Sequence, residues 1–436
     1  MKRLTKRQLR IIIAVNFLLI TVMGVAIFFL VQESAKLPIY PPDDRPPITE
    51  HTRRRTAEIS LNPFLSWELE LVGEAQSVFS YIREQTNTLF IFGNSFRAGY
   101  DFDSTGVFVV AMDVYGVTRE GGFWSFGMPE DRLRYVSVAE GGFVLAVEGT
   151  LPYLLHIDFE GEVIRRVDGF LNSFESIHSI RHIMGEGFLM FTVPHNTLTG
   201  VRGLRAIFFD AQLNSRGSSL ATSVYSLELV KIFGGRGGTA TVFVNASSGA
   251  RNMPSVVQFN LGASTNVRVF EEFNGRLLGV SIHNGEFLLM VGINGSSLLR
   301  LRANFEVVGS LTQLSTQAPL FFDMLDVDGH HYLALFENSG AILNSNLVNM
   351  GVVPRMLVSD MQFVSNAVIF AGVTRPPLAE NDMVTVNIFD DGQLIMSAPI
   401  MAGGNAKLAL SRRHLICVFN IGNRVVVSAL RYPLFL

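Results

Sequence analysis

The residues of this chain that could bind a metal ion fall short of a complete ligand set. Asp101, Asp103 and Gly106 follow the start of a calcium-binding loop, in which carboxylates at alternate positions coordinate the ion. The twelfth position of such a loop supplies a bidentate Glu, but here it is Met112, and residues 108–110 indicate a strand instead of a helix. We interpret the segment as a polar hairpin, with a metal at Asp101 and Asp103 as the minor alternative.

Histidine and glycine motifs are also better explained by structure than by chemistry. His178 and His182 are four residues apart, as in a metal pair on a helix, but the flanking SIHSIRHIM predicts a strand. His330 and His331 are adjacent in a predicted strand and therefore point to opposite faces. The glycines of residues 234–238 lack the Lys-Ser/Thr ending of a phosphate loop and favour a tight turn. A similar acidic turn, without a complete ligand set, contains Asp323, Asp326 and Asp328.

No nucleophile motif is visible in the sequence. Cys417 is the single cysteine, which excludes an intrachain disulfide and a cysteine metal cluster. Because it lies in an apolar run, residues 415–419, we expect it to be buried as a small hydrophobic residue. No cofactor is predicted.

Composition and charge limit the class of protein. The 436 residues are 48% hydrophobic and 17% charged, with 39 Gly and 35 Phe, which favours many short strands buried on both faces. Residues 1–55 contain ten Lys or Arg against four Asp or Glu, a charge of +6, which leaves −9 for the remainder of a total of −3. A mildly acidic globular part argues against nucleic-acid binding.

The N-terminal region predicts a membrane anchor. Residues 1–10 carry five cations and no acid, and residues 11–31 are apolar except for Asn16 and Thr21. As a helix, this run is about 31 Å long, enough to span a bilayer. A cleaved signal peptide is the alternative, but the run is long for one, and Glu33 occupies a position of the nearest cleavage site where a small residue is required. We predict a retained signal anchor with the N-terminus in the cytoplasm and the remainder extracytoplasmic at the cell membrane.

Residues 32–60 are predicted to be a linker. Prolines are concentrated in residues 38–47 and favour an extended, semi-rigid spacer between the membrane and the domain that follows, residues 61–436.

The remainder of the chain is a repeat of short strands. Residues 134–168 predict four strands, at 135–139, 142–148, 153–159 and 162–167, separated by Gly-containing turns. The second strand of that unit recurs at a spacing of about 47 residues, typical of propeller blades. The recurring runs are residues 88–94, 142–148, 187–193, 239–245, 286–292, 331–337, 367–373 and 415–420. Most turns between third and fourth strands contain Asp or Asn, whose side chain can bond the following amides.

The ends of the repeat predict how it closes. The third strand of the last unit, residues 424–432, is followed by no fourth strand, whereas residues 67–72 form an extra strand before the first unit. If the early strand completes the last unit, the ring closes without an open edge. We predict an all-β fold of eight four-stranded blades, with seven as the alternative if the units around residues 338–350 or 366–395 are misread.

These units resemble the β-propeller superfamily over residues 65–436. Markers of particular subfamilies are absent, since Trp67 and Trp124 are the only tryptophans and neither precedes Asp, and the sialidase Asp box and the quinoprotein docking motif are not found. The resemblance therefore implies a fold and transfers no functional residues.

We expect recognition by the long loops between second and third strands, which collect on one face of a propeller. These loops are residues 94–106, 194–203, 245–254 and 374–382; ordinary solvated insertions are the alternative. The predicted contact residues are Phe96, Arg97, Tyr100, His195, Arg202, Arg251 and Arg375.

The sequence predicts a binding module at a bacterial cytoplasmic membrane, for a protein, peptide or envelope glycan. The alternative is a propeller-type hydrolase or lyase with a metal held by Asp101, Asp103 and His195. A structural subunit of an envelope assembly is a third interpretation.

Overall fold

All residues described in the computed structural model belong to the unit Pro46–Leu436. They are residues 52–54, 65–71, 75–95, 106–171, 175–194, 203–233, 238–262, 265–283, 285–293, 295–309, 312–315, 319–325, 331–336, 340–344, 349–353, 357–364, 367–374, 383–390, 393–410 and 415–430. Within them, no helix has the length and hydrophobicity needed to cross a membrane. The predicted membrane segment, residues 11–31, lies outside the described residues.

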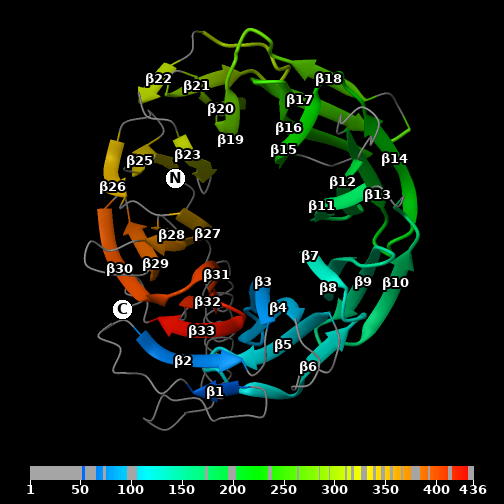
Figure 1. Cartoon of the computed structure of the whole chain (residues 1–436), viewed down its shortest axis with the longest axis vertical. Helices are drawn as coiled ribbons and strands as arrows, with labels where there is room; N and C mark the ends of the chain where they lie inside the picture. Colours follow the sequence, from blue (N-terminus) through cyan, green and yellow to red (C-terminus); the bar gives the residue numbers. More distant parts are fainter. Residues whose placement is uncertain are drawn as a thin grey trace, which may run out of the picture. The chain divides into compact units, whose positions relative to one another are not determined.

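The described residues form eight antiparallel sheets, seven of four strands and one of five. Each four-stranded sheet contains four consecutive strands in chain order, whereas the five-stranded sheet combines the last three strands of the chain with the first two. We number them sheets 1 to 8 from the sheet that begins with β3. In each sheet the first strand lies innermost, next to a common centre (Figure 1). The first strands are β3 (Ala75–Arg83), β7 (Arg132–Ala139), β11 (Glu175–Ile183), β15 (Ser226–Phe233), β19 (Arg276–His283), β23 (Pro319–Leu325), β27 (Leu357–Val364) and β31 (Gly404–Leu410).

The second and third strands form the middle of each sheet. The second strands are β4 (Thr88–Ser95), β8 (Gly142–Glu148), β12 (Gly187–Pro194), β16 (Thr239–Ser248), β20 (Glu286–Gly292), β24 (His331–Phe336), β28 (Ala367–Thr374) and β32 (Leu415–Ile421). The third strands are β5 (Val107–Asp113), β9 (Tyr153–Asp158), β13 (Leu204–Phe209), β17 (Arg251–Asn260), β21 (Ser296–Leu301), β25 (Gly340–Asn344), β29 (Met383–Asp390) and β33 (Arg424–Leu430). Every second strand predicted from the repeat is confirmed.

The fourth strands lie outermost. In sheets 1 to 7 they are β6 (Thr118–Phe126), β10 (Val163–Asp168), β14 (Ser215–Ala221), β18 (Asn266–Val269), β22 (Thr312–Ser315), β26 (Asn349–Val353) and β30 (Gln393–Ala402). The four-strand unit predicted within residues 134–168 is confirmed as β7 to β10, with ends shifted by a few residues.

The prediction that an early strand completes the last unit is confirmed. Strand β2 (Leu65–Leu71) pairs antiparallel with the C-terminal strand β33, so Leu69 lies opposite Val427. Residues 52–54, inside the predicted linker, form β1 (Thr52–Arg54), which pairs with β2 as a fifth strand. One sheet therefore contains strands from both ends of the unit.

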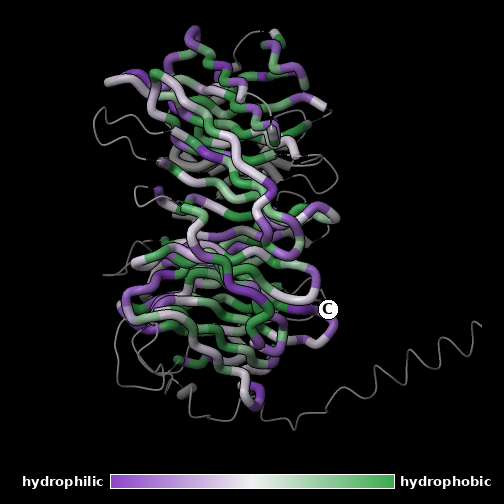
Figure 2. The backbone as a smooth tube through the Cα atoms, turned by 90° about the vertical axis from the view of Figure 1, so that its right-hand side faces the viewer, coloured by the Kyte–Doolittle hydropathy of each residue, from purple (hydrophilic) through white to green (hydrophobic). Residues whose placement is uncertain are grey.

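Hydrophobic side chains fill the spaces between consecutive sheets. Residues of β4, β5, β8 and β9 form one cluster between sheets 1 and 2, in which the ring centroids of Phe92 and Phe143 are 4.7 Å apart. Comparable clusters join sheets 8 and 1, 2 and 3, 3 and 4, 4 and 5, and 7 and 8. Middle strands are buried on both faces, which explains their continuous apolar runs, seen as green stretches in Figure 2. Cys417 is among these buried residues, as predicted.

Asp side chains organise the turns between third and fourth strands as the sequence predicted. Asp113 Oδ1 accepts hydrogen bonds from the N–H groups of Tyr115 and Val117, both at 2.9 Å. Asp158 and Asp210 each accept from the amides two and four residues later. This local bonding fixes where the third strand ends and the outer strand begins.

Candidate functional site

Each sheet has one edge at which its first strand begins and its second strand ends, and we call this the loop edge. Antiparallel pairing places Ala75 opposite Ser95 in sheet 1, and Arg132 opposite Glu148 in sheet 2. Connections between second and third strands leave from this edge, and so do the connections from one sheet to the next. The ends of the strands that flank the loops predicted for recognition therefore share one edge with the starts of the innermost strands.

Most residues predicted for contact lie outside the described residues. This applies to Phe96, Arg97, Tyr100, His195, Arg202 and Arg375, and to the candidate metal ligands Asp101 and Asp103. Their roles stay predictions. Asp323 lies in β23, and His331 begins β24, but the structure does not describe their side chains.

The prediction of a long loop at residues 245–254 is wrong. Strand β16 continues to Ser248 and β17 begins at Arg251, so Gly249 and Ala250 alone form the turn. Pro254, which suggested a loop, lies inside β17 opposite Asn245. The loop edge nevertheless contains Arg251, as predicted: the side chain is exposed, and Nη2 donates to the Glu271 carbonyl at 3.3 Å.

A β-bulge near the start of each first strand shapes the inner part of the loop edge. A bulge inserts an extra residue and changes the direction of side chains along the strand. The bulges lie between Ser77 and Phe79, Leu133 and Tyr135, Ile177 and Ser179, Leu229 and Lys231, Leu277 and Gly279, Pro319 and Phe321, Val358 and Asp360, and Gly404 and Lys407.

The residue before the bulge is the point at which several sheets are joined. Leu133 N–H donates to Asn94 Oδ1 of the preceding sheet at 2.7 Å, and Leu277 N–H donates to Asn245 Oδ1 at 2.6 Å. The same contact is made by Ile177 with Glu148 at 2.7 Å, and by Ser77 with Asn420 at 3.0 Å. A polar side chain at the end of a second strand thus satisfies a backbone donor on the next sheet's innermost strand, which needs a partner because that strand is an edge. The last contact joins sheet 8 to sheet 1.

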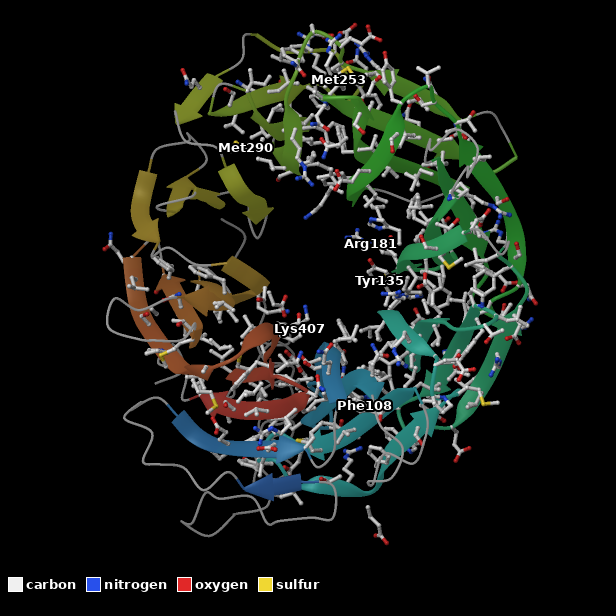
Figure 3. The ribbon with its side chains drawn as sticks, viewed as in Figure 1. Phe108, Tyr135, Arg181, Met253, Met290 and Lys407 are labelled. Atoms are coloured by element: carbon white, nitrogen blue, oxygen red, sulfur yellow. The ribbon has the colours of Figure 1, made fainter. Side chains whose placement is uncertain are left out.

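Aromatic and charged side chains lie at or near the starts of the first strands of sheets 2 to 5. The rings of Tyr135 and His178 are nearly parallel, with centroids 6.4 Å apart. Burial raises the pKa of Tyr135 and lowers that of His178, so both side chains are neutral at pH 7. Arg134 pairs with Glu148 at 2.6 Å, and Arg276 with Glu228 at 2.9 Å. Figure 3 places Tyr135 at the inner side of its sheet, together with Arg181 and Lys407 from other sheets.

Asp131 ties the turn that connects sheets 1 and 2 to strand β9 of sheet 2. It is 5% exposed, and Oδ2 accepts hydrogen bonds from Met128 N–H at 2.9 Å and from the Tyr153 hydroxyl at 3.0 Å. Burial, together with the neighbouring Asp131, raises the pKa of Tyr153 and keeps its hydroxyl protonated as a donor. A Cβ at Gly149 would overlap the Asp131 carboxylate, so the turn after β8 must pass directly over this group.

This arrangement presents apolar side chains to solvent from a rigid support. Met128 is 63% exposed and Leu151 is 68% exposed, although both belong to short turns packed on Asp131. Tyr135 on the adjoining innermost strand is 37% exposed. Exposed apolar and aromatic side chains on a fixed backbone are suited to binding, because little conformational entropy is lost on association.

The described part of the chain contains no group of three or more His, Cys, Asp or Glu side chains that could hold a metal ion. His178 and His182 lie on strand β11, as the sequence indicated, with His178 as its bulged residue. The His182 ring packs 5.1 Å from that of Phe188. These histidines therefore have packing roles.

Sequence reasoning missed Asp131 and the polar contacts between sheets. A signal for the latter exists, because three of the predicted second strands end in Asn at positions 94, 245 and 420. No comparable signal marks Asp131, since its partners come from three separate turns and strands.

Comparisons with known proteins identify the fold. No protein-family model matches the sequence, and no curated protein matches it significantly. Among solved structures, the Dos1 propeller has a TM-score of 0.53 at 11% identity, covering 82% of this chain and 93% of that one. Sqt1 of Chaetomium thermophilum has a TM-score of 0.54 at 10% identity, covering 83% and 96%. The C-terminal WD40 domain of Sif2 has a TM-score of 0.50 at 10% identity, covering 84% and 98%.

At such identities the similarity concerns the fold alone, and a fold does not by itself assign a function. The sheets, their inner-to-outer strand order and these structural matches together show that the described part of the chain is a β-propeller.

Proposed function

We propose that this protein is a membrane-anchored binding protein whose eight-bladed propeller lies outside the cytoplasmic membrane. The eight sheets, with β2 completing the last one, support eight blades. The anchor rests on the apolar run of residues 11–31 and the cations before it. Residues 32–51, which include the proline-rich stretch, then separate the span from β1.

The loop edge binds the partner, which is a protein or peptide. The observation that carries this proposal is the exposure of Met128 and Leu151, in the two turns that approach the buried Asp131, at the edge where the strand of Tyr135 begins. Interfaces favour such a group of exposed Met and aromatic side chains. The predicted loop residues Phe96, Arg97, Tyr100, His195, Arg202, Arg251 and Arg375 add contacts around it. An envelope glycan is the alternative ligand, and a sugar ring would bind by stacking on the aromatic ring of Tyr135.

The binding surface is tested with a photoreactive residue in the full-length protein in its native membrane. Benzoylphenylalanine replaces Met128 in one variant and Met184 in another; Met184 is 81% exposed and lies in the turn between β11 and β12, at the opposite edge. We expect one discrete crosslinked protein from position 128 and none from position 184. Equal crosslinking from both positions, or none from position 128, would contradict the proposal.

The location is tested with a thiol reagent that does not cross membranes. Cys417 is buried, and burial raises its pKa, so it contributes no reactive thiol while the protein is folded. Met184→Cys adds one exposed thiol. We expect labelling of this variant, and not of the parent protein, in cells whose cytoplasmic membrane is intact. Labelling of Met184→Cys only after lysis would place the propeller in the cytoplasm.

A further inference from the structure

All three histidine side chains that the structure describes lie at the boundary between sheets 2 and 3. His156 lies on β9 of sheet 2, and His178 and His182 lie on β11 of sheet 3. The rings of His156 and His182 pack against Phe188 of β12, with centroids 6.5 and 5.1 Å from that of Phe188. The ring of His178 stacks on Tyr135 of sheet 2. Titratable rings are therefore part of the packing between these two sheets.

The His156 ring is poorly placed to carry a charge. Its Nε2 atom is buried and has no hydrogen-bond partner among the described residues. Protonation puts a hydrogen on both ring nitrogens, so the imidazolium would bury a donor without an acceptor. Burial is the largest influence and lowers the pKa of His156; Asp158 opposes it, and His182 adds to it. Arg165, opposite His156 on β10, is a cation that donates to Asn214 Oδ1 of sheet 3 at 2.7 Å.

His178 has a similar environment nearer the centre of the propeller. Burial is again the largest influence on its pKa and lowers it, while a backbone hydrogen bond and Glu228 of β15 oppose this. Tyr135, on which the ring stacks, is neutral at pH 7, because burial raises its pKa. Glu148 accepts the N–H of the residue before His178 at 2.7 Å, and it pairs with Arg134 at 2.6 Å. His178 is therefore also packed in its neutral form.

Separation of the two sheets would remove these constraints. The sheets are joined by an apolar cluster that includes Ala146, Leu154 and Met190, and by the His182 N–H, which donates to Ser137 Oγ at 2.8 Å. When the sheets separate, water reaches the histidine rings and their pKa returns to the ordinary value of about 6.5. The open form then binds protons more strongly than the closed form, so acid favours opening.

We infer that the boundary between sheets 2 and 3 is an acid-sensitive joint, at which the two sheets separate when His156 and His178 bind protons. The closed joint has its full stability above about pH 6.5 and loses it as the pH falls below that value. A histidine that stays neutral in the closed joint favours opening about tenfold at pH 5.5, one unit below its ordinary pKa. Tyr135 lies at this joint, so opening also changes the proposed binding surface, although the inference does not depend on that function.

The test measures how fast a thiol reagent reaches the interior of the joint in the full-length protein in mild detergent. Ala146→Cys places a thiol on β8 in the apolar cluster between sheets 2 and 3. Ala111→Cys is the matched control, because it places a thiol on β5 in the cluster between sheets 1 and 2, and both alanines are 0% exposed. The ratio of the two labelling rates removes the dependence of thiol reactivity on pH. We expect this ratio to rise at least about tenfold between about pH 7.5 and pH 5.5.

Variants without the titrating groups show whether the histidines cause the rise. His156→Gln and His178→Gln keep a polar side chain that binds no proton in this range. In the Ala146→Cys protein, each should reduce the acid-induced rise at least about threefold, and both together should leave less than about a twofold rise.

Two results would overturn the inference. One is a ratio that stays constant between the two pH values, as unfolding of the whole domain would produce by exposing both thiols equally. The other is a rise in the double variant as large as in the parent. Each histidine is also replaced alone, so a variant that loses cooperative unfolding at pH 7.5 is set aside and the remaining one decides the result.

Discussion

Replacing Leu69 by alanine is expected to lower the free energy of unfolding by about 3 kcal/mol, in the range found for buried Leu truncations. Leu69 is 0% exposed and lies in the hydrophobic cluster between sheets 8 and 1. Its strand, β2, joins the early part of the domain to β33. The truncation therefore leaves a cavity in the sheet that closes the ring. Urea unfolding of the full-length protein in detergent, followed by tryptophan fluorescence, measures the change.

Leu394→Ala provides the matched control for this experiment. Leu394 lies on the outermost strand β30 and is 44% exposed, so its truncation should change stability by less than about 0.5 kcal/mol. A similar loss of stability in both variants would contradict the prediction, because it would show that the buried Leu69 contributes no more to stability than an exposed leucine.

The second large effect is expected from Asp131→Ala, at about 3 kcal/mol. The substitution removes the acceptor of the Met128 N–H, in a partly buried bond, and of the Tyr153 hydroxyl, in a buried one. Buried donors without an acceptor carry the full cost of desolvation, and bonds to a charged acceptor are stronger than neutral ones. The crosslink from position 128 should also fall in yield at temperatures where the domain is still folded, because the turn that carries it loses its anchor.

Asp168→Ala separates this effect from the loss of an ordinary carboxylate. The Asp168 side chain is 45% exposed and pairs with Arg166 at the surface, at 3.0 Å. Its removal should cost less than about 1 kcal/mol and leave crosslinking from position 128 unchanged. An equal loss of stability and of crosslinking in both variants would contradict the prediction that Asp131 positions the turn that carries Met128.

The strands could be predicted because burial and turn chemistry act locally in the chain. Strand β8 is an apolar run between glycine-containing turns, and its bounds agree with the prediction at both ends. The pairing of β2 with the last unit could be predicted from the number of strands, because that unit lacked a fourth strand of its own. The hairpin of β16 and β17 was missed because Arg251, Asn252 and Pro254 look like loop residues, although pairing with β16 holds them in a strand.

The site was harder to predict because its geometry depends on the register between strands. The bulge that makes His178 an extra residue cannot be recognised within β11 alone, because it is defined by the pairing with β12. Asp131 gains its role only when Met128, Gly149 and Tyr153 converge on it. The predicted loop residues other than Arg251 lie outside the described residues, so their part in recognition stays a prediction.

The polar contacts that join neighbouring sheets also make particular backbone amides sensitive to one kind of motion. The amides of Ser77, Leu133, Ile177 and Leu277 each donate to a side-chain acceptor on the preceding sheet. Amides within a ladder instead donate to carbonyl groups of their own sheet. Hydrogen–deuterium exchange at these four positions therefore reports the separation of one sheet from the next, and exchange along the ladders reports fraying inside a sheet. The exchange rates of these four amides, near the starts of four innermost strands, therefore measure how often neighbouring sheets of the propeller separate.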